Sequence, residues 1–115
     1  MMIWNGPKKK LESMRLRNEG EGPPYRFDHS QIAEAGYNRI VCTYPRYSEI
    51  FYDLVDQLEH DPHNAGLPFR IDSAKERDFF LTGTPRVRHA PATRLLYEVL
   101  EIKKRVIVWS VSQKE

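Results

Sequence analysis

The strongest hydrophobic pattern in the chain predicts a helix that begins at Ser48 and ends before Pro62. Its apolar residues recur with the 3.6-residue period of one helix face and are Ile50, Phe51, Leu54, Val55 and Leu58. The opposite face carries the polar residues Asp53, Asp56, Gln57 and Glu59. The Ser48 hydroxyl is a suitable cap for the first turn, because it can accept a hydrogen bond from a free backbone N–H.

The segment before this helix has a mixed pattern. The β-branched run Arg39–Tyr44 predicts a strand. Ahead of it, Asp28–Ala35 predicts a short helix, capped by either Asp28 or Ser30 and stopped by Gly36. This part of the chain therefore contributes one short helix and one strand to the predicted fold.

The C-terminal part of the chain predicts a β-hairpin. Arg94–Leu100 and Arg105–Val111 are largely apolar runs of strand length. A charged turn around Ile102–Lys104 joins them. The apolar positions of the two runs are numerous enough for a sheet that one or more helices cover.

A further strand is predicted ahead of this hairpin, starting at Pro85. Because strand side chains alternate between faces, we expect Arg86 and Arg88 on one face and Val87 on the other. The stretch Arg70–Phe80 remains open between a short helix and an irregular crossing segment.

Residues 1–24 differ in composition from the rest of the chain. They include Lys8–Lys10 and the Pro23-Pro24 pair, and they show no sustained helix or strand period. We therefore divide the chain into an N-terminal tail, residues 1–24, which is flexible or docked on a partner, and one folded domain, residues 25–115. A short edge strand at residues 11–17 is an alternative for part of the tail.

Length and composition predict a soluble protein of the cytoplasm. The chain has 115 residues, 40% hydrophobic and 30% charged, which suits one globular domain. No apolar run approaches the roughly 20 residues that cross a bilayer, and the N-terminus does not have the order of a secretory signal. The single cysteine, Cys42, excludes an internal disulfide, and its apolar surroundings predict a small core residue of a strand.

Positive charge is concentrated in the C-terminal part of the chain. Residues 86–115 hold seven Lys or Arg residues and three acidic ones, whereas residues 1–85 hold eleven and thirteen. A cationic sheet face of this kind can hold phosphate groups, because guanidinium groups stay charged and present paired donors to phosphate oxygens. The alternative is a solvated strand face, or ordinary ion pairs with the acidic helix.

The segment ATRLLYEVLEIKKRVIVWSVSQKE, Ala92–Glu115, resembles the RelE/ParE superfamily of toxins from type II toxin–antitoxin pairs. The resemblance lies in the arginine that enters a strand as R-L-L-Y, the charged turn, and the run V-I-V-W-S-V. Upstream, LEHDPHNAGLPF is similar to the family's helix–Pro–Gly entry to the sheet. The resemblance extends over about residues 39–115.

This resemblance implies an α+β fold, in which a small twisted antiparallel β-sheet has one or two helices packed on one face. In the ribonuclease branch it implies metal-independent cleavage of mRNA on the ribosome, without a cofactor. The 2′-hydroxyl attacks the adjacent phosphate, and basic side chains stabilise the transition state. The implied partners are a cognate antitoxin protein and RNA, and we name Tyr47, Tyr52 and the tail as candidate antitoxin contacts.

The implied site residues are mainly cationic. The sheet arginine of the R-L-L-Y strand corresponds to Arg94, and the basic pair on the preceding strand corresponds to Arg86 and Arg88. The basic residue after the last strand corresponds to Lys114, and Arg105 is expected to bind substrate as well. His89 is our substitute for the family's proton-transfer group, because its side chain titrates near neutral pH; the alternative is a solvated loop histidine.

Two other functions stay open at this stage. One is a ParE-like inhibitor that binds DNA gyrase, and the other is a non-catalytic binding module that keeps the fold. The basic residues favour the nuclease, whereas the short sequence after Lys114 favours the other two. His60 and His63 have the spacing of a metal pair, but Pro62 interrupts the helix between them, so we expect no metal site.

Overall fold

The computed structural model describes residues 23–74 and 76–114. The predicted tail, residues 1–24, lies almost wholly outside the described residues, as does its alternative edge strand at residues 11–17. The division into a tail and a domain therefore stays a prediction. Neither helix of the described chain has both the length and the apolar character needed to cross a bilayer.

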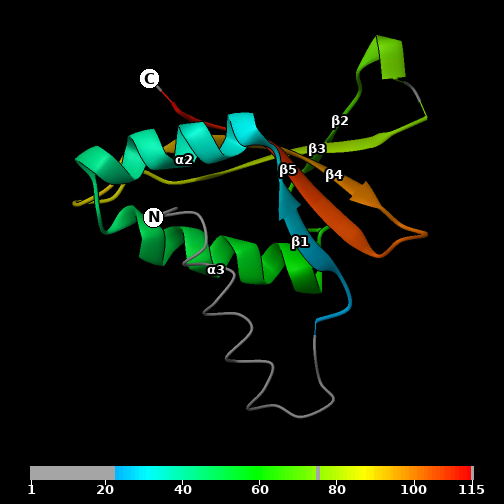
Figure 1. The fold of residues 1–115 in the computed structure, drawn as a ribbon, viewed down its shortest axis with the longest axis horizontal. Coiled ribbons are helices and arrows are strands. Elements are labelled where there is room, and N and C mark those ends of the chain that lie inside the picture. Colours follow the sequence, from blue (N-terminus) through cyan, green and yellow to red (C-terminus); the bar gives the residue numbers. More distant parts are fainter. Residues whose placement is uncertain (1–22, 75, 115) are drawn as a thin grey trace.

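The described chain folds into a five-stranded sheet and two α-helices (Figure 1). The strands lie in the order β1-β5-β4-β3-β2, and the antiparallel neighbours β2, β3, β4 and β5 form most of the sheet. Only β1 pairs in parallel, with β5. The predicted α+β class is confirmed, and β1 makes the sheet mixed at one edge. The strand bounds are β1 (Arg26–His29), β2 (Leu67–Phe69), β3 (Asp78–Thr84), β4 (Thr93–Leu100) and β5 (Arg105–Gln113).

The predicted C-terminal hairpin is confirmed. Strands β4 and β5 pair along their lengths around a turn at residues 101–104, in which Lys104 adopts a positive φ of 50°. The register shifts between Leu96 and Tyr97, where Trp109 is the extra residue of β5. Because of this bulge, Val106, Val108 and Val111 all point into the core although their spacing changes.

The predicted strand at Arg39–Tyr44 is wrong, because this run belongs to helix α2 (Gln31–Thr43). The buried residues Ala33, Gly36, Tyr37 and Ile40 form one stripe at helical spacing. The cap is Ser30, one of the two candidates, whose hydroxyl accepts a hydrogen bond from the Ala33 N–H at 3.0 Å. The β-branched run joins the helix because burial of Ile40 in this stripe outweighs the local preference for a strand.

Gly36 continues helix α2 instead of stopping it. The glycine lets the helix approach strand β5 closely, since a Cβ at this position would lie 2.0 Å from the carbonyl oxygen of Val111. The prediction that Cys42 is a core residue is also wrong, because the helix turns its side chain outward and it is exposed.

The predicted second helix is confirmed as α3 (Tyr47–His60). Its apolar stripe is buried as expected, but the Ser48 hydroxyl does not cap it and donates instead to the carbonyl of Pro45 at 3.1 Å. Glu59, expected on the polar face, is fully buried. Its carboxylate accepts a hydrogen bond from the Phe27 N–H at 3.0 Å, so the helix supplies a partner for strand β1.

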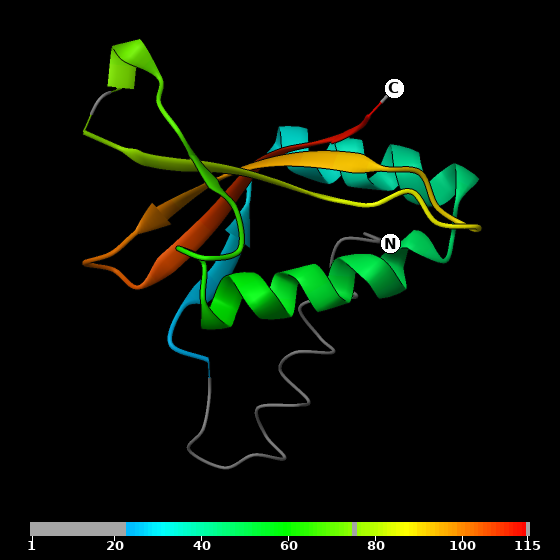
Figure 2. The ribbon, with the colours of Figure 1, turned by 180° about the vertical axis from the view of Figure 1, so that it is seen from behind.

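The core lies between the two helices and one face of the sheet. Helices α2 and α3 run antiparallel beside each other, which Figures 1 and 2 show from opposite sides. From β4, the residues Leu95, Tyr97 and Val99 point into this core. The alternating residues Arg94, Leu96 and Glu98 therefore face away from the helices, on what we call the outer face.

The ambiguous stretch at Arg70–Phe80 forms a short 3-10 helix, η1 (Asp72–Ala74), and the start of β3. Directly before β3, this stretch places Arg77 on the outer face of the sheet. The Arg77 guanidinium donates to both carboxylate oxygens of Glu98, at 2.9 and 2.7 Å, and lies over the rings of Phe79 and Trp109. This cluster explains why Glu98 is buried although it points away from the helices.

Candidate functional site

Arg94 occupies the outer face at the beginning of β4. It lies opposite Gly83 of β3 and Ser112 of β5, and its own side chain is exposed. A small open pocket of about 290 Å³ is lined by Arg94, Ser112, Gln113 and Lys114. The Lys114 N–H donates to the carbonyl of Ala92 at 2.8 Å, which holds the residue after β5 beside the start of β4.

Buried hydroxyl groups fix the strand ends that carry this pocket. The Tyr47 hydroxyl lies 3.0 Å from the Thr93 hydroxyl, which in turn lies 2.6 Å from that of Thr84. Burial raises the pKa of Tyr47, so the phenol remains protonated and can donate. Gly83 allows a close approach here as well, because a Cβ would lie 2.2 Å from the Thr93 carbonyl oxygen.

Arg86 and Arg88 do not lie on a strand, so this prediction is wrong. Strand β3 ends at Thr84, and the following residues form a loop in which Val87 and Ala90 exchange two backbone hydrogen bonds of 3.0 and 3.3 Å. Pro85 and Pro91 flank this small turn. Neither proline can donate to a strand ladder, and both favour a loop at this place.

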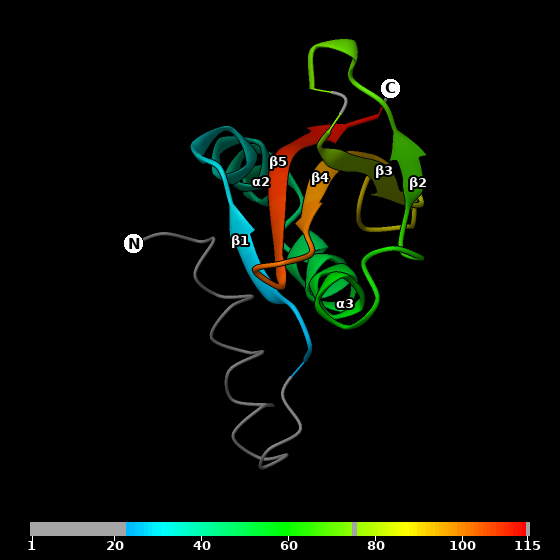
Figure 3. The ribbon, with the colours of Figure 1, turned by 90° about the vertical axis from the view of Figure 1, so that its right-hand side faces the viewer.

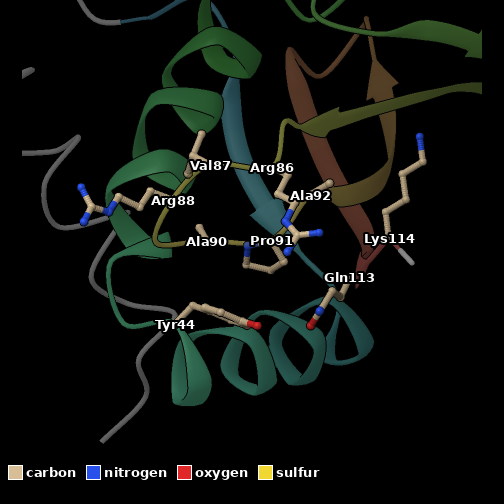
Figure 4. A pocket seen from close by; sticks show the side chains of 9 residues that line it. All are labelled: Tyr44, Arg86, Val87, Arg88, Ala90, Pro91, Ala92, Gln113 and Lys114. Atoms are coloured by element: carbon tan, nitrogen blue, oxygen red, sulfur yellow. The ribbon is translucent and has the colours of Figure 1, made fainter.

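This loop forms one wall of a larger groove of about 830 Å³. Its apolar lining comes mainly from Val87, Ala90 and Pro91, with Tyr44 from the end of α2. In Figure 4 the Arg86 guanidinium points toward Tyr44 and Gln113, whereas Arg88 points away on the other side of the loop. The groove therefore combines apolar walls with one inward-pointing guanidinium.

The groove and the Arg94 pocket are neighbours, because Gln113 and Lys114 line both. Within the described residues, no carboxylate forms an ion pair with Arg86, Arg88, Arg94 or Lys114. The sheet thus carries a group of uncompensated cations at the end where β4 begins and β5 finishes. Such a group attracts phosphate, and its planar guanidinium groups suit the phosphate oxygens.

Two other predicted site residues lie apart from this group. His89 sits at the tip of the Val87–Ala90 turn and lines neither pocket. Arg105 starts β5, at the opposite end from Lys114, and its guanidinium lies 3.7 Å from the carboxylate of Asp28. Lys114 follows Arg105 by nine positions of extended chain, about 30 Å at 3.3 Å per residue.

Each of the two histidines contacts another group of the protein. His63 Nε2 lies 2.6 Å from the Glu101 carboxylate, and His60 Nδ1 lies 2.8 Å from the Asp56 carbonyl oxygen. Among the described residues, no three His, Cys, Asp or Glu side chains lie close enough together to hold a metal ion.

Sequence reasoning missed Tyr44 and Gln113. Tyr44 was assigned to a strand, although its position directly before Pro45 is a common signal for the end of a helix. Gln113 follows the apolar run of β5 and carries no charge, so no sequence signal distinguished it. Both become candidates only because the fold brings them to the loop at residues 85–92.

Comparison with known proteins identifies the architecture. No protein-family model and no curated protein matches the chain. Among solved structures, it is similar to the RelBE2 toxin–antitoxin complex of Mycobacterium tuberculosis, with 18% identity, a TM-score of 0.57, and 79% of this chain and 99% of that chain covered. It is also similar to the isolated E. coli RelE toxin, with 22% identity and a TM-score of 0.55, over 79% of this chain and 85% of that one.

The intact E. coli RelBE toxin–antitoxin complex is a third similar structure. It shares 22% identity with this chain at a TM-score of 0.53, over 79% of this chain and 98% of that chain. The three matches cover 79% of this chain and between 85% and 99% of the compared chains. The chain therefore has the fold of the RelE toxins.

Proposed function

We propose that this protein is the toxin of a toxin–antitoxin pair and cleaves mRNA on the ribosome without a metal ion. The observation that carries this proposal is the position of Arg94 and Lys114. They share one pocket on the outer face of a RelE-type sheet, and no carboxylate of the described chain pairs with either. A ribosomal target also agrees with the cytoplasmic location expected from the sequence.

In the proposed reaction, the chain holds the phosphate on which the RNA reacts. The 2′-oxygen forms a bond to phosphorus, the bond from phosphorus to the 5′-oxygen breaks, and a 2′,3′-cyclic phosphate and a 5′-hydroxyl result. The 2′-hydroxyl loses a proton and the 5′-oxygen gains one. Arg94 stabilises the extra negative charge of the crowded transition state, and Lys114 adds a second cation beside it.

The adjoining groove suits the neighbouring nucleotide. Tyr44 and Val87 offer apolar surface to a base, while the Gln113 amide can donate to and accept from a base edge. Arg86 points into the same groove and can bind a flanking phosphate (Figure 4). Because His89 lines neither pocket, we attribute the contribution of the chain mainly to charge stabilisation, and His89 stays a proposal as proton donor.

An antitoxin is the proposed protein partner, since two of the similar structures are toxin–antitoxin complexes. The described fold rules out one candidate contact: Tyr47 is fully buried and bonded to Thr93, so it cannot reach a partner. The protein of an adjacent gene should co-purify with this chain. If the chain is harmless to growing cells and binds no neighbour, the toxin assignment fails.

The test of activity uses ribosomes carrying a defined mRNA. Purified protein should cut the mRNA at positions within the ribosome, and naked mRNA should be cut more slowly. Arg39→Ala, which removes an exposed arginine of α2 that lines neither pocket, should cut like the wild type. Intact mRNA after incubation with folded wild-type protein would contradict the nuclease and leave gyrase binding or a non-catalytic role.

A further inference from the structure

A second cationic pocket lies at the other end of the sheet. It has a volume of about 510 Å³ and is formed where the start of β1 meets the turn between β4 and β5. Figure 3 shows these two segments side by side, although they are far apart in the sequence. The charged residues that line it are Arg26, Lys103, Lys104 and Arg105.

The backbone holds this pocket in a fixed shape. The Arg26 N–H donates to the carbonyl of Lys104 at 2.8 Å, so the first residue of β1 is tied to the turn. Within the turn, the Lys104 N–H donates to the carbonyl of Glu101 at 3.2 Å. Arg26 and Arg105 are also direct partners in the β1–β5 register. The four cations are thus held close together, instead of being free to separate along a loop.

The carboxylates nearby are already engaged. Asp28 pairs with Arg105 at 3.7 Å. Glu101 pairs with Lys104, accepts hydrogen bonds from the Tyr25 hydroxyl at 2.9 and 2.8 Å, and contacts His63. No described carboxylate forms an ion pair with the remaining cations, Arg26 and Lys103. The pocket therefore keeps a net positive charge that a bound anion would neutralise.

We propose that this pocket is a second phosphate-binding site, which takes the backbone of an RNA strand outside the region of the cleaved bond. Both Arg26 and Lys103 are exposed and can approach phosphate oxygens without losing an existing partner in the described chain. Pro23, Pro24 and the buried Tyr25 also line the pocket, but they do not form the extended apolar centre that a stable protein interface usually needs. Phosphodiester is therefore a better match than an acidic protein segment.

The second site is separate from the first. Arg105 and Lys114 mark opposite ends of β5, about 30 Å apart at 3.3 Å per residue, so one phosphate cannot contact both. This separation gives a separate role to Arg105, which is expected from the sequence to bind substrate. The site acts in RNA binding and does not depend on cleavage at Arg94.

The experiment measures binding of the full chain to a short 2′-O-methyl RNA, which cannot undergo attack by a 2′-hydroxyl. We compare the wild type with the double variant Arg26→Ala/Lys103→Ala and with a matched double variant, Arg39→Ala/Arg70→Ala, that removes the same charge elsewhere. Fluorescence anisotropy over a salt series gives Kd and its salt dependence, and circular dichroism checks folding. Lys103→Ala alone serves as a milder variant.

We expect Arg26→Ala/Lys103→Ala to raise Kd about three- to tenfold at low salt and to reduce the slope of log affinity against log salt by about 0.7, the value for one phosphate contact on a single strand, whereas the matched variant changes neither by as much. Equal effects in both double variants would overturn the site, as would unchanged binding. Poly-glutamate and unlabelled RNA are also compared as competitors at equal total charge. If poly-glutamate displaces the labelled RNA as well as unlabelled RNA does, the site binds an acidic protein instead. Cleavage is not measured, so these outcomes are distinct from a failure of the proposed nuclease.

Discussion

The hydroxyl of Tyr47 on helix α3 lies 3.0 Å from that of Thr93, the residue that precedes Arg94. Tyr47 is fully buried, and its phenol and the Thr84 hydroxyl are the partners of Thr93 inside the protein. The helix layer is therefore joined by a buried polar contact to the strand that carries the candidate phosphate site.

This contact gives a first prediction. Tyr47→Phe keeps the ring in the core and removes only its hydroxyl, so it should lower the free energy of unfolding by about 0.5–1.5 kcal/mol. Thr93 keeps Thr84 as a partner, so the loss should not be larger. Chemical denaturation of both proteins measures the difference. An unchanged midpoint would show that the hydrogen bond contributes nothing.

The approach of α2 to β5 gives a second prediction. Gly36→Ala should destabilise the protein by about 1–3 kcal/mol, because the new methyl group would collide with the Val111 carbonyl oxygen. This result is opposite in sign to the usual gain when Gly in a helix becomes Ala. At the exposed neighbour, Ala35→Gly should cost about 1 kcal/mol through helix propensity alone. If thermal unfolding shows Gly36→Ala to be stabilising, the close contact is wrong.

These helices also show how far the sequence alone could lead. The apolar stripe of α3 could be predicted because its helical period continues over several turns. The β4–β5 hairpin could be predicted because two apolar runs of strand length are joined by a charged turn. The prediction for Arg39–Tyr44 is wrong because its β-branched residues favour a strand locally. The contact that favours the helix, the close packing of Gly36 against the Val111 backbone, joins residues that are distant in sequence. The burial of Glu59 depends likewise on a backbone N–H of β1.

The candidate site could be predicted only in part. Arg94 and Lys114 were named from the resemblance of the R-L-L-Y strand and of the basic residue after the last strand to the toxin family, and they do line one pocket. The alternation of Arg86 and Arg88 imitates a strand, but the prolines on either side produce a turn that sends the two side chains in different directions (Figure 4). Tyr44 lines the groove only because the fold brings the end of α2 next to the loop at residues 85–92.

The outer-face cluster gives a prediction about pH. Hydrogen bonds from the Arg77 guanidinium hold the pKa of Glu98 below its ordinary value of 4.5, against the opposing effect of burial. A carboxyl whose pKa is lower in the folded state stabilises the protein fully above its unfolded pKa, and this contribution disappears as pH falls through the folded value. Wild type should therefore lose more stability between neutral and acid pH than Glu98→Gln.

Urea titrations at neutral pH and below pH 4 would measure this difference. At neutral pH, Arg77→Ala should destabilise the protein, because it leaves the buried Glu98 carboxylate with the Trp109 N–H as its remaining hydrogen-bond partner among the described residues. Equal acid sensitivity of the wild type and Glu98→Gln would show that the pair does not respond to pH in this way.

Lys114 gives a prediction about RNA binding. Lys114→Ala should weaken binding of a 2′-O-methyl RNA and lower the slope of log affinity against log salt by about 0.7, the value for one phosphate contact on a single strand. Arg39→Ala should leave the slope as it is. If both variants bind like the wild type at low and high salt, Lys114 makes no phosphate contact.

The central claim is that Arg94 stabilises the transition state of RNA cleavage. The most direct measurement is the single-turnover rate of cleavage of ribosome-bound mRNA by the wild type, Arg94→Ala and Arg94→Lys, with folding checked by circular dichroism. Arg94→Ala should be slower by tens-fold to about a thousand-fold, or ~2–4 kcal/mol, and Arg94→Lys should fall between, since it keeps the charge without the planar fork. A folded Arg94→Ala protein that cuts at the wild-type rate would contradict the account.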